Sequence, residues 1–446
     1  MTKDLTTGKP QSVLWMYSIP MFISVIFQQM YNIADSIIAG KFAGEDALAA
    51  VGASYPITMI FMAIAVGSNI GCSVVISKLF GGKRYGRMKT AIRTALISSL
   101  IMSIILTIIG LFISSQLMNL LHTPSNVFYD GTLYLRIYIG GFLFLYLYNV
   151  CTGIFQSLGD SKTPLWFLIC SSLGNIVLDY IFVAICHWGV AGVAWATFIA
   201  QGIACLLAIV TLMIRLRSIS CEEESNMFSL VMLKSISMIA IPSILQQSFI
   251  SIGNLLVQGL INGYGSSTIA GYSAAIKLNT FTITSFTTLA NGLSCYTAQN
   301  IGAGKMERVR DGFRAGIKMT FIVMIPFLFV YYFFGREMLQ LFMKSSSVEA
   351  LDVGEAFLCI VSPFYYVISL KLMADGVLRG AGDMGAFMTS TFVDLILRVI
   401  LSFILSSEMG TNGIWLSWPI GWVISTILAV LFYRFGRWNK IKNGNI

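Results

Sequence analysis

The chain has 446 residues, of which 56% are hydrophobic and only 11% are charged, and its mean hydropathy is +0.79. A soluble domain has about 25% charged residues, so the composition excludes that class and predicts a polytopic membrane protein. The net charge of +9 could suit nucleic-acid binding. The basic residues lie in short loops between apolar segments rather than on one soluble face, which argues against that function.

Twelve apolar segments are long enough to cross a bilayer as helices, which takes about 20 residues. In chain order they are residues 13–39, 48–77, 91–114, 131–157, 164–187, 190–214, 235–261, 268–297, 315–334, 353–378, 386–407 and 411–434. They are uniformly apolar, without the period-two alternation of barrel strands, so they predict an all-α membrane protein. The first segment is too long for a signal peptide and contains Asp35, so we expect it to stay in the mature chain.

Basic residues are concentrated in alternate loops. The regions 78–93 and 305–318 are rich in Lys and Arg, whereas the opposite loops keep only Lys41, Arg336 and Lys344. The positive-inside rule then places both termini in the cytoplasm. We expect a multi-pass protein of the bacterial cell (inner) membrane.

The two halves of the chain repeat. A shift of 221 residues aligns Gly71 with Gly292, and a shift of 223 aligns Gly153 with Gly376 and Asp160 with Asp383. A duplicated six-helix unit explains these matches. Six is even, so the halves must be parallel repeats related by a pseudo-two-fold axis along the membrane normal, with a cavity at their interface. We predict an N-terminal lobe of residues 1–217, a cytoplasmic linker of residues 218–234 that contains Glu222 and Glu223, and a C-terminal lobe of residues 235–446.

Two spans of the first lobe carry acidic residues at membrane depth. Asp35 is the one charged residue of the first span, and Asn175 and Asp179 lie one helical turn apart on the fifth. Acidic residues inside a membrane are costly and usually functional. If the two helices meet, the carboxylates with Asn175 and Thr197 offer oxygen ligands for Na⁺, or a pair that shares a proton.

A second group of ionisable residues lies in the last spans. Lys371 and Asp375 are four residues apart, as are Asp394 and Arg398. This spacing places the members of each pair on one helix face, so we predict two structural ion pairs. A second-lobe polar site formed by these four residues is the weaker alternative.

The chain lacks the sequence motifs of ATP-hydrolysing P-loops, zinc proteases and serine hydrolases. We therefore expect a protein that is not an enzyme, has no cofactor and draws its energy from an ion gradient.

Three segments resemble one known family. The run from Pro20 to Gly52 resembles the first-helix signature of multidrug and toxic compound extrusion (MATE) transporters, and the segments 153–160 and 376–383 resemble its paired lobe motifs. The resemblance covers essentially the whole chain. Within the family, the chain resembles the bacterial DNA-damage-inducible F branch.

The resemblance implies an antiporter that exports amphipathic, often cationic compounds in exchange for Na⁺ or H⁺ by alternating access. In that branch the cation site matches Asp35, Asn175, Asp179 and Thr197 here. Weaker candidates line the substrate cavity, namely Gln28, Tyr31, Asn149 and Gln156. We expect a monomer whose partners are small molecules and membrane lipids, without nucleic acid. The alternative is a lipid-linked oligosaccharide flippase of the same superfamily.

Overall fold

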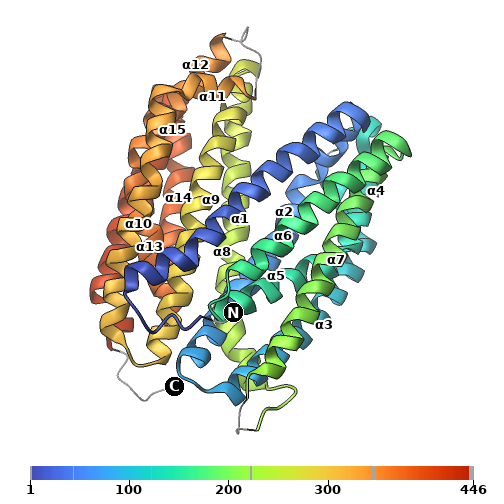
Figure 1. Cartoon of the computed structure of the whole chain (residues 1–446). Helices are drawn as coiled ribbons and strands as arrows, with labels where there is room; N and C mark the ends of the chain where they lie inside the picture. The colour runs from blue at the N-terminus through green and yellow to red at the C-terminus, as the bar shows by residue number, and fades with distance from the viewer. Residues whose placement is uncertain (1–2, 44, 122, 221–223, 343–347, 441–446) are drawn as a thin grey trace. The chain divides into compact units, whose positions relative to one another are not determined.

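The computed structural model describes residues 3–43, 45–121, 123–220, 224–342 and 348–440, and these ranges contain helices but no strand (Figure 1). Glu222, Glu223 and Lys344 lie outside the described residues. The predicted all-α class is confirmed.

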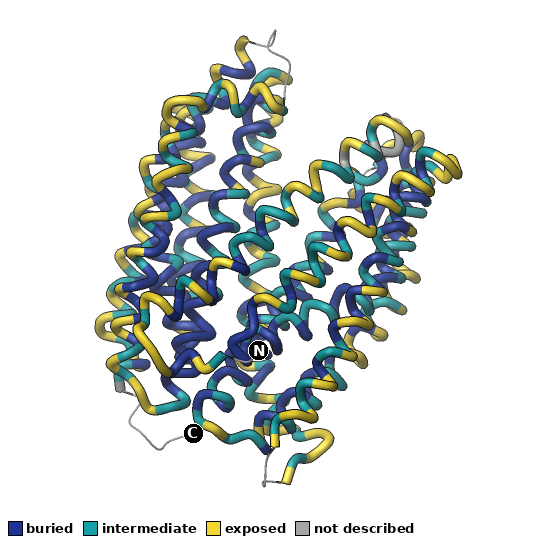
Figure 2. The backbone as a smooth tube through the Cα atoms, viewed as in Figure 1, coloured by how far each residue is buried: buried dark blue, intermediate teal, exposed yellow. Residues whose placement is uncertain are grey.

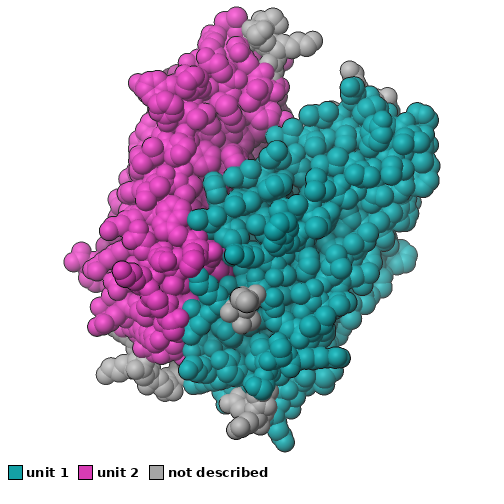
Figure 3. All heavy atoms as spheres, in the orientation of Figure 1, with its two compact units in different colours: residues 1–4, 19–248 teal, residues 5–18, 249–446 magenta. Residues whose placement is uncertain are grey.

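The chain divides into two compact units (Figure 3). Unit 1 comprises the residues up to Asp4 and Ile19–Ser248, and unit 2 comprises Leu5–Ser18 and Phe249–Ile446. Helices α1 and α8 each contribute residues to both units. The lobe boundaries expected from the sequence stay a prediction.

The elements of the first half are α1 (Pro10–Ile38), η1 (Ala39–Ala43), α2 (Glu45–Gly81), α3 (Tyr85–Leu120), α4 (Ser125–Gly140), α5 (Phe142–Ser157), α6 (Lys162–Asp179), η2 (Tyr180–Ile185), α7 (Gly189–Ser218) and α8 (Leu230–Asn262). Those of the second half are α9 (Ser266–Gly302), α10 (Met306–Phe333), α11 (Gly335–Gln340), α12 (Val348–Val361), η3 (Ser362–Phe364), α13 (Tyr365–Ala381), α14 (Met384–Met409), α15 (Thr411–Phe435) and η4 (Arg437–Lys440).

Each of the twelve predicted spans coincides with helix. Among the described residues, ten helices are long and apolar enough to cross a membrane, and the pair α4–α5 makes eleven. The chain bends by 46° between α4 and α5, at Gly141, so the span 131–157 is broken rather than straight. The span 353–378 is interrupted by η3, which contains Pro363; proline removes a helical hydrogen bond. The span 268–297 forms α9, which is not among these ten helices, because its many Ser, Thr and Asn residues lower its hydropathy.

Glycines at matching positions make matching contacts in the two units. A Cβ atom on Gly153 of α5 would lie 2.8 Å from the carbonyl oxygen of Asn69 on α2. In unit 2, a Cβ atom on Gly376 of α13 would lie 2.6 Å from the carbonyl oxygen of Ala290 on α9. Both distances are below van der Waals contact, so only glycine allows these close helix approaches. The same contact made twice supports the duplicated unit.

Each unit has its own apolar interior. Exposed residues lie along the outer helices (Figure 2), and many large apolar residues are among the exposed ones. The core of unit 2 is rich in aromatic residues, and Trp415 stacks on Tyr272 with ring centroids 5.3 Å apart. Helix α3 in unit 1 exposes Ile101, Ile105 and Ile108 to between 46% and 53%. Apolar residues on the outside of a helical bundle are typical of contact with lipid.

Candidate cation site in the first unit

Two α-helices of unit 1 continue directly into π-helical segments. Helix α1 ends at Ile38 and is followed by η1, and α6 ends at Asp179 and is followed by η2. The two π-helical segments contact each other, and the ring of Phe42 meets the ring of Tyr180 edge-on at 5.8 Å. π-Helical turns are rare and frequently mark functional sites. This contact brings together the two helix ends that carry Asp35 and Asp179.

The carboxyl groups of Asp35 and Asp179 lie within hydrogen-bonding reach of each other. Asp179 is fully buried. Among the described residues, no donor reaches either oxygen of Asp179 or the buried Oδ1 of Asp35. Two buried carboxylates without donors repel each other, so the pair needs a shared proton or a bound cation.

Asn175 and Thr197 place neutral oxygens beside the carboxyl groups of Asp35 and Asp179. Asn175 is 2% exposed and lies one turn before Asp179 on α6. Its Nδ2 donates to Thr197 Oγ1 of α7 at 3.5 Å, which leaves Asn175 Oδ1 buried without a donor. A buried polar atom without a protein partner favours a bound ion or water beside it. The structure thus brings together all four residues predicted for the cation site, and their role stays a prediction.

Two tyrosines lie close to the two carboxylates. Tyr31 on α1 lies beside Thr197, and Tyr31 and Tyr134 of α4 are both close enough to interact electrostatically with the two aspartates. Tyr134 and Thr197 also line a cavity of about 20 Å³, roughly the space of one water molecule. Sequence reasoning missed Tyr134, because a tyrosine in an apolar span gives no signal of what its hydroxyl faces.

The four substrate-cavity candidates do not form one cluster. Tyr31 lies beside the carboxylates, whereas Gln28 is exposed on α1. Asn149 on α5 donates from Nδ2 to the carbonyl oxygen of Leu145 in its own helix at 2.8 Å. Gln156 is half-buried near the end of α5. Their contact with substrate stays a prediction.

In unit 2, Lys371 and Asp375 form the predicted ion pair. Lys371 Nζ lies 2.9 Å from Asp375 Oδ2, and the two side chains are 3% and 2% exposed. The hydroxyl of Ser390 on α14 donates to Asp375 Oδ1 at 2.9 Å. The charged groups of the pair are therefore bound by side chains of α13 and α14 alone, as expected of a structural pair.

The predicted ion pair between Asp394 and Arg398 is not formed. The guanidinium of Arg398 instead donates to Asn254 Oδ1 of α8 at 3.2 Å and lies 4.3 Å from the ring centroid of Trp418. The guanidinium thus contacts an amide oxygen and an aromatic face on neighbouring helices, while its Nε is buried without an acceptor among the described residues. Helical spacing does not reveal such partners on other helices. Asp394 Oδ1 is left buried, and no donor from the described residues reaches it.

Comparison with known proteins finds one family model in both halves of the chain. The family model described as MatE matches residues 20–181 and 242–404, once in each half. The chain is 28% identical over 446 residues to the probable multidrug resistance protein YpnP of Bacillus subtilis (strain 168), covering 98% of each chain. A solved structure of MATE in complex with MaL6 matches with a TM-score of 0.91 at 25% identity, covering 99% of each chain. The outward-facing structure of a multidrug resistance MATE family transporter of the MOP superfamily matches with a TM-score of 0.90 at 25% identity, covering 98% of this chain and 97% of that one.

Proposed function

The chain belongs to the MatE family, and we propose that it is a secondary active antiporter that exports amphipathic, often cationic compounds in exchange for Na⁺ or H⁺. We assign it to the bacterial cell (inner) membrane, with both termini in the cytoplasm, as the distribution of Lys and Arg predicts for the termini. Two of the proteins described above are named for multidrug resistance, so the flippase alternative is not favoured.

One observation supports the coupling site most directly. Four buried oxygens, those of Asp179 together with Asp35 Oδ1 and Asn175 Oδ1, have no donor among the described residues. Buried acceptors gathered in one place favour a positive ion or a proton. Carboxylate and amide oxygens suit a hard cation such as Na⁺, and a proton on one carboxyl group would let it donate to the other.

Coupling requires that the ion and the exported compound favour different conformations, because a ligand shifts an equilibrium only by its differential affinity for the two states. We assign the ion to Asp35, Asn175, Asp179 and Thr197. Neutralisation of the carboxylates draws the ends of α1 and α6 together at the contact between η1 and η2. We assign contact with the exported compound to Gln28, Tyr31, Asn149 and Gln156. Tyr31 lies beside Thr197, so it connects the two groups of residues.

The test is transport by the purified protein in liposomes. Ethidium, a cationic amphipathic dye, is the probe, and an inward Na⁺ gradient and an inward proton gradient are imposed separately. We expect one gradient to drive ethidium transport and expect Asp35→Asn and Asp179→Asn to reduce that transport at least tenfold, because each removes one of the charges that bind the ion.

The control is Asp352→Asn, which neutralises a carboxylate whose side chain is 59% exposed and should leave transport unchanged. Undiminished gradient-driven transport by both site variants would refute the site. If neither gradient drives ethidium transport by the wild-type protein, antiport of cationic compounds is refuted.

A further inference from the structure

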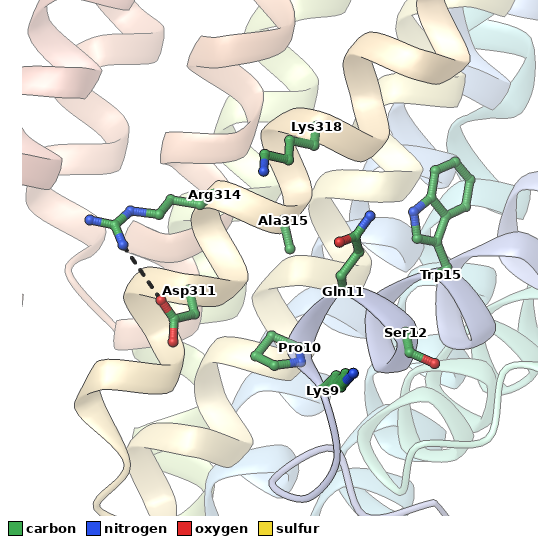
Figure 4. A pocket seen from close by; sticks show the side chains of 9 residues that line it. All are labelled: Lys9, Pro10, Gln11, Ser12, Trp15, Asp311, Arg314, Ala315 and Lys318. Atoms are coloured by element: carbon green, nitrogen blue, oxygen red, sulfur yellow. Dashed lines mark ion pairs between the residues drawn. The ribbon is translucent and has the colours of Figure 1, made fainter.

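A groove in unit 2 lies between the first turns of α1 and the N-terminal half of α10 (Figure 4). Its volume is about 590 Å³, and it is lined by Lys9, Pro10, Gln11, Ser12, Trp15, Asp311, Arg314, Ala315 and Lys318. In Figure 4, Gln11 extends from α1 toward α10, and a dashed line joins Arg314 to Asp311. The proposed antiport does not use this groove.

The groove is positively charged. Three cations and one carboxylate line it, which gives a formal charge of +2 (three minus one). The Asp311–Arg314 pair is 3.6 Å apart with side chains 55% and 76% exposed, so it neutralises little. Neither Lys9 nor Lys318 forms an ion pair with a described residue. The backbone N–H groups in the first turn of α1 add to the positive potential, because a helix N-terminus favours anions.

The face of α10 that begins in the groove becomes apolar further along the helix. After Arg314 and Lys318, the residues at successive helical turns are Ile322, Ile325 and Phe329, which are 52%, 57% and 55% exposed. Spacings of three and four residues place them on one stripe. The ligand that matches this stripe has an anionic end and a long apolar end.

The position of the groove favours a lipid rather than a soluble anion as its ligand. It lies at the ends of two helices that are each long and apolar enough to cross a membrane. Trp15 lines it one turn into α1, and tryptophan is enriched at the level of lipid headgroups. Lysine and arginine at this level attract anionic lipids.

We propose that this groove binds the phosphate headgroup of an anionic phospholipid. Lys9, Arg314 and Lys318 contact the phosphate, and the acyl chains lie along Ile322, Ile325 and Phe329. The lipid thereby joins the first turns of α1 to α10 within unit 2.

The test uses purified full-length protein and phosphatidylglycerol. Native mass spectrometry measures the phosphatidylglycerol retained on the wild type and on the triple variant Lys9→Gln, Arg314→Gln, Lys318→Gln. A photoactivatable phosphatidylglycerol locates the site. We expect the triple variant to retain at least tenfold less lipid, since each cation near the surface contributes a few-fold, and we expect the wild-type crosslinks in the peptides that contain residues 9–15 and 314–329.

The matched control is the triple variant Arg87→Gln, Arg217→Gln, Lys234→Gln, which removes three exposed cations outside the groove and should retain lipid like the wild type. Phosphatidylcholine should be retained weakly by all proteins, and 10 mM inorganic phosphate should not displace phosphatidylglycerol. Equal losses in the two triple variants, or crosslinks spread evenly over the chain, would overturn the proposal. Displacement by inorganic phosphate would also overturn it, in favour of a soluble-anion site. Because the readout is binding, the result is independent of ion coupling.

Discussion

The ion pair of Lys371 and Asp375 allows a stability prediction worked from the structure. Its atoms are 2.9 Å apart and its side chains are 3% and 2% exposed, so solvent hardly screens it. Lys371→Met leaves Asp375 as a buried charge with Ser390 as its remaining donor. Removal of one partner of a buried pair costs about 3–5 kcal/mol. We expect the single variant to lose that much stability.

The double variant Lys371→Met, Asp375→Asn should recover most of the loss. It removes the buried charge, and the Asn oxygen can still accept the hydrogen bond from Ser390, so the remaining cost should be about 1 kcal/mol. The assay is thermal melting in detergent followed with a thiol-reactive fluorophore, because Cys72, Cys151 and Cys295 are buried and become reactive on unfolding.

An exposed ion pair supplies the control. Arg336 lies 2.8 Å from both Asp352 and Glu355, and these side chains are 37%, 59% and 44% exposed. Hydrogen bonds to the two carboxylates raise the pKa of Arg336, so it stays charged throughout the range in which the protein can be studied. Arg336→Gln should leave the melting temperature almost unchanged. The reasoning is refuted if Lys371→Met melts like the wild type, or if the double variant melts as low as the single one.

Two further predictions concern packing. Gly71→Ala would place a Cβ atom 2.6 Å from the Cβ of Ala240 on α8 and should cost about 1–3 kcal/mol by overpacking, whereas Gly385→Ala meets nothing within 4 Å and should melt like the wild type; equal melting temperatures of the two variants would contradict this. Trp415→Ala removes a fully buried ring and should cost about 3–5 kcal/mol, and the same assay should show little loss for Trp166→Ala, whose ring is 63% exposed.

The helices and the duplication follow from the sequence because hydropathy and residue spacing are local properties. Each predicted span coincides with helix, and Gly153 and Gly376, aligned by the sequence shift, make equivalent close contacts. The bend at Gly141 was not predicted, because an apolar run shows where a helix is favoured but not where its axis turns. The ion pair of Lys371 and Asp375 was predicted because its partners share one helix.

The sequence by itself determined which residues carry charge at membrane depth, since a rare carboxylate in an apolar run is visible without any fold. It could not determine which of these charges meet. The tertiary structure decided that Asp35 on α1 lies beside Asp179 on α6, through the contact between η1 and η2. It also decided that Arg398 pairs with Asn254 and Trp418 rather than with Asp394. The physical reason is that spacing along a helix fixes only the face on which a side chain lies, whereas its partner on another helix depends on how the helices pack.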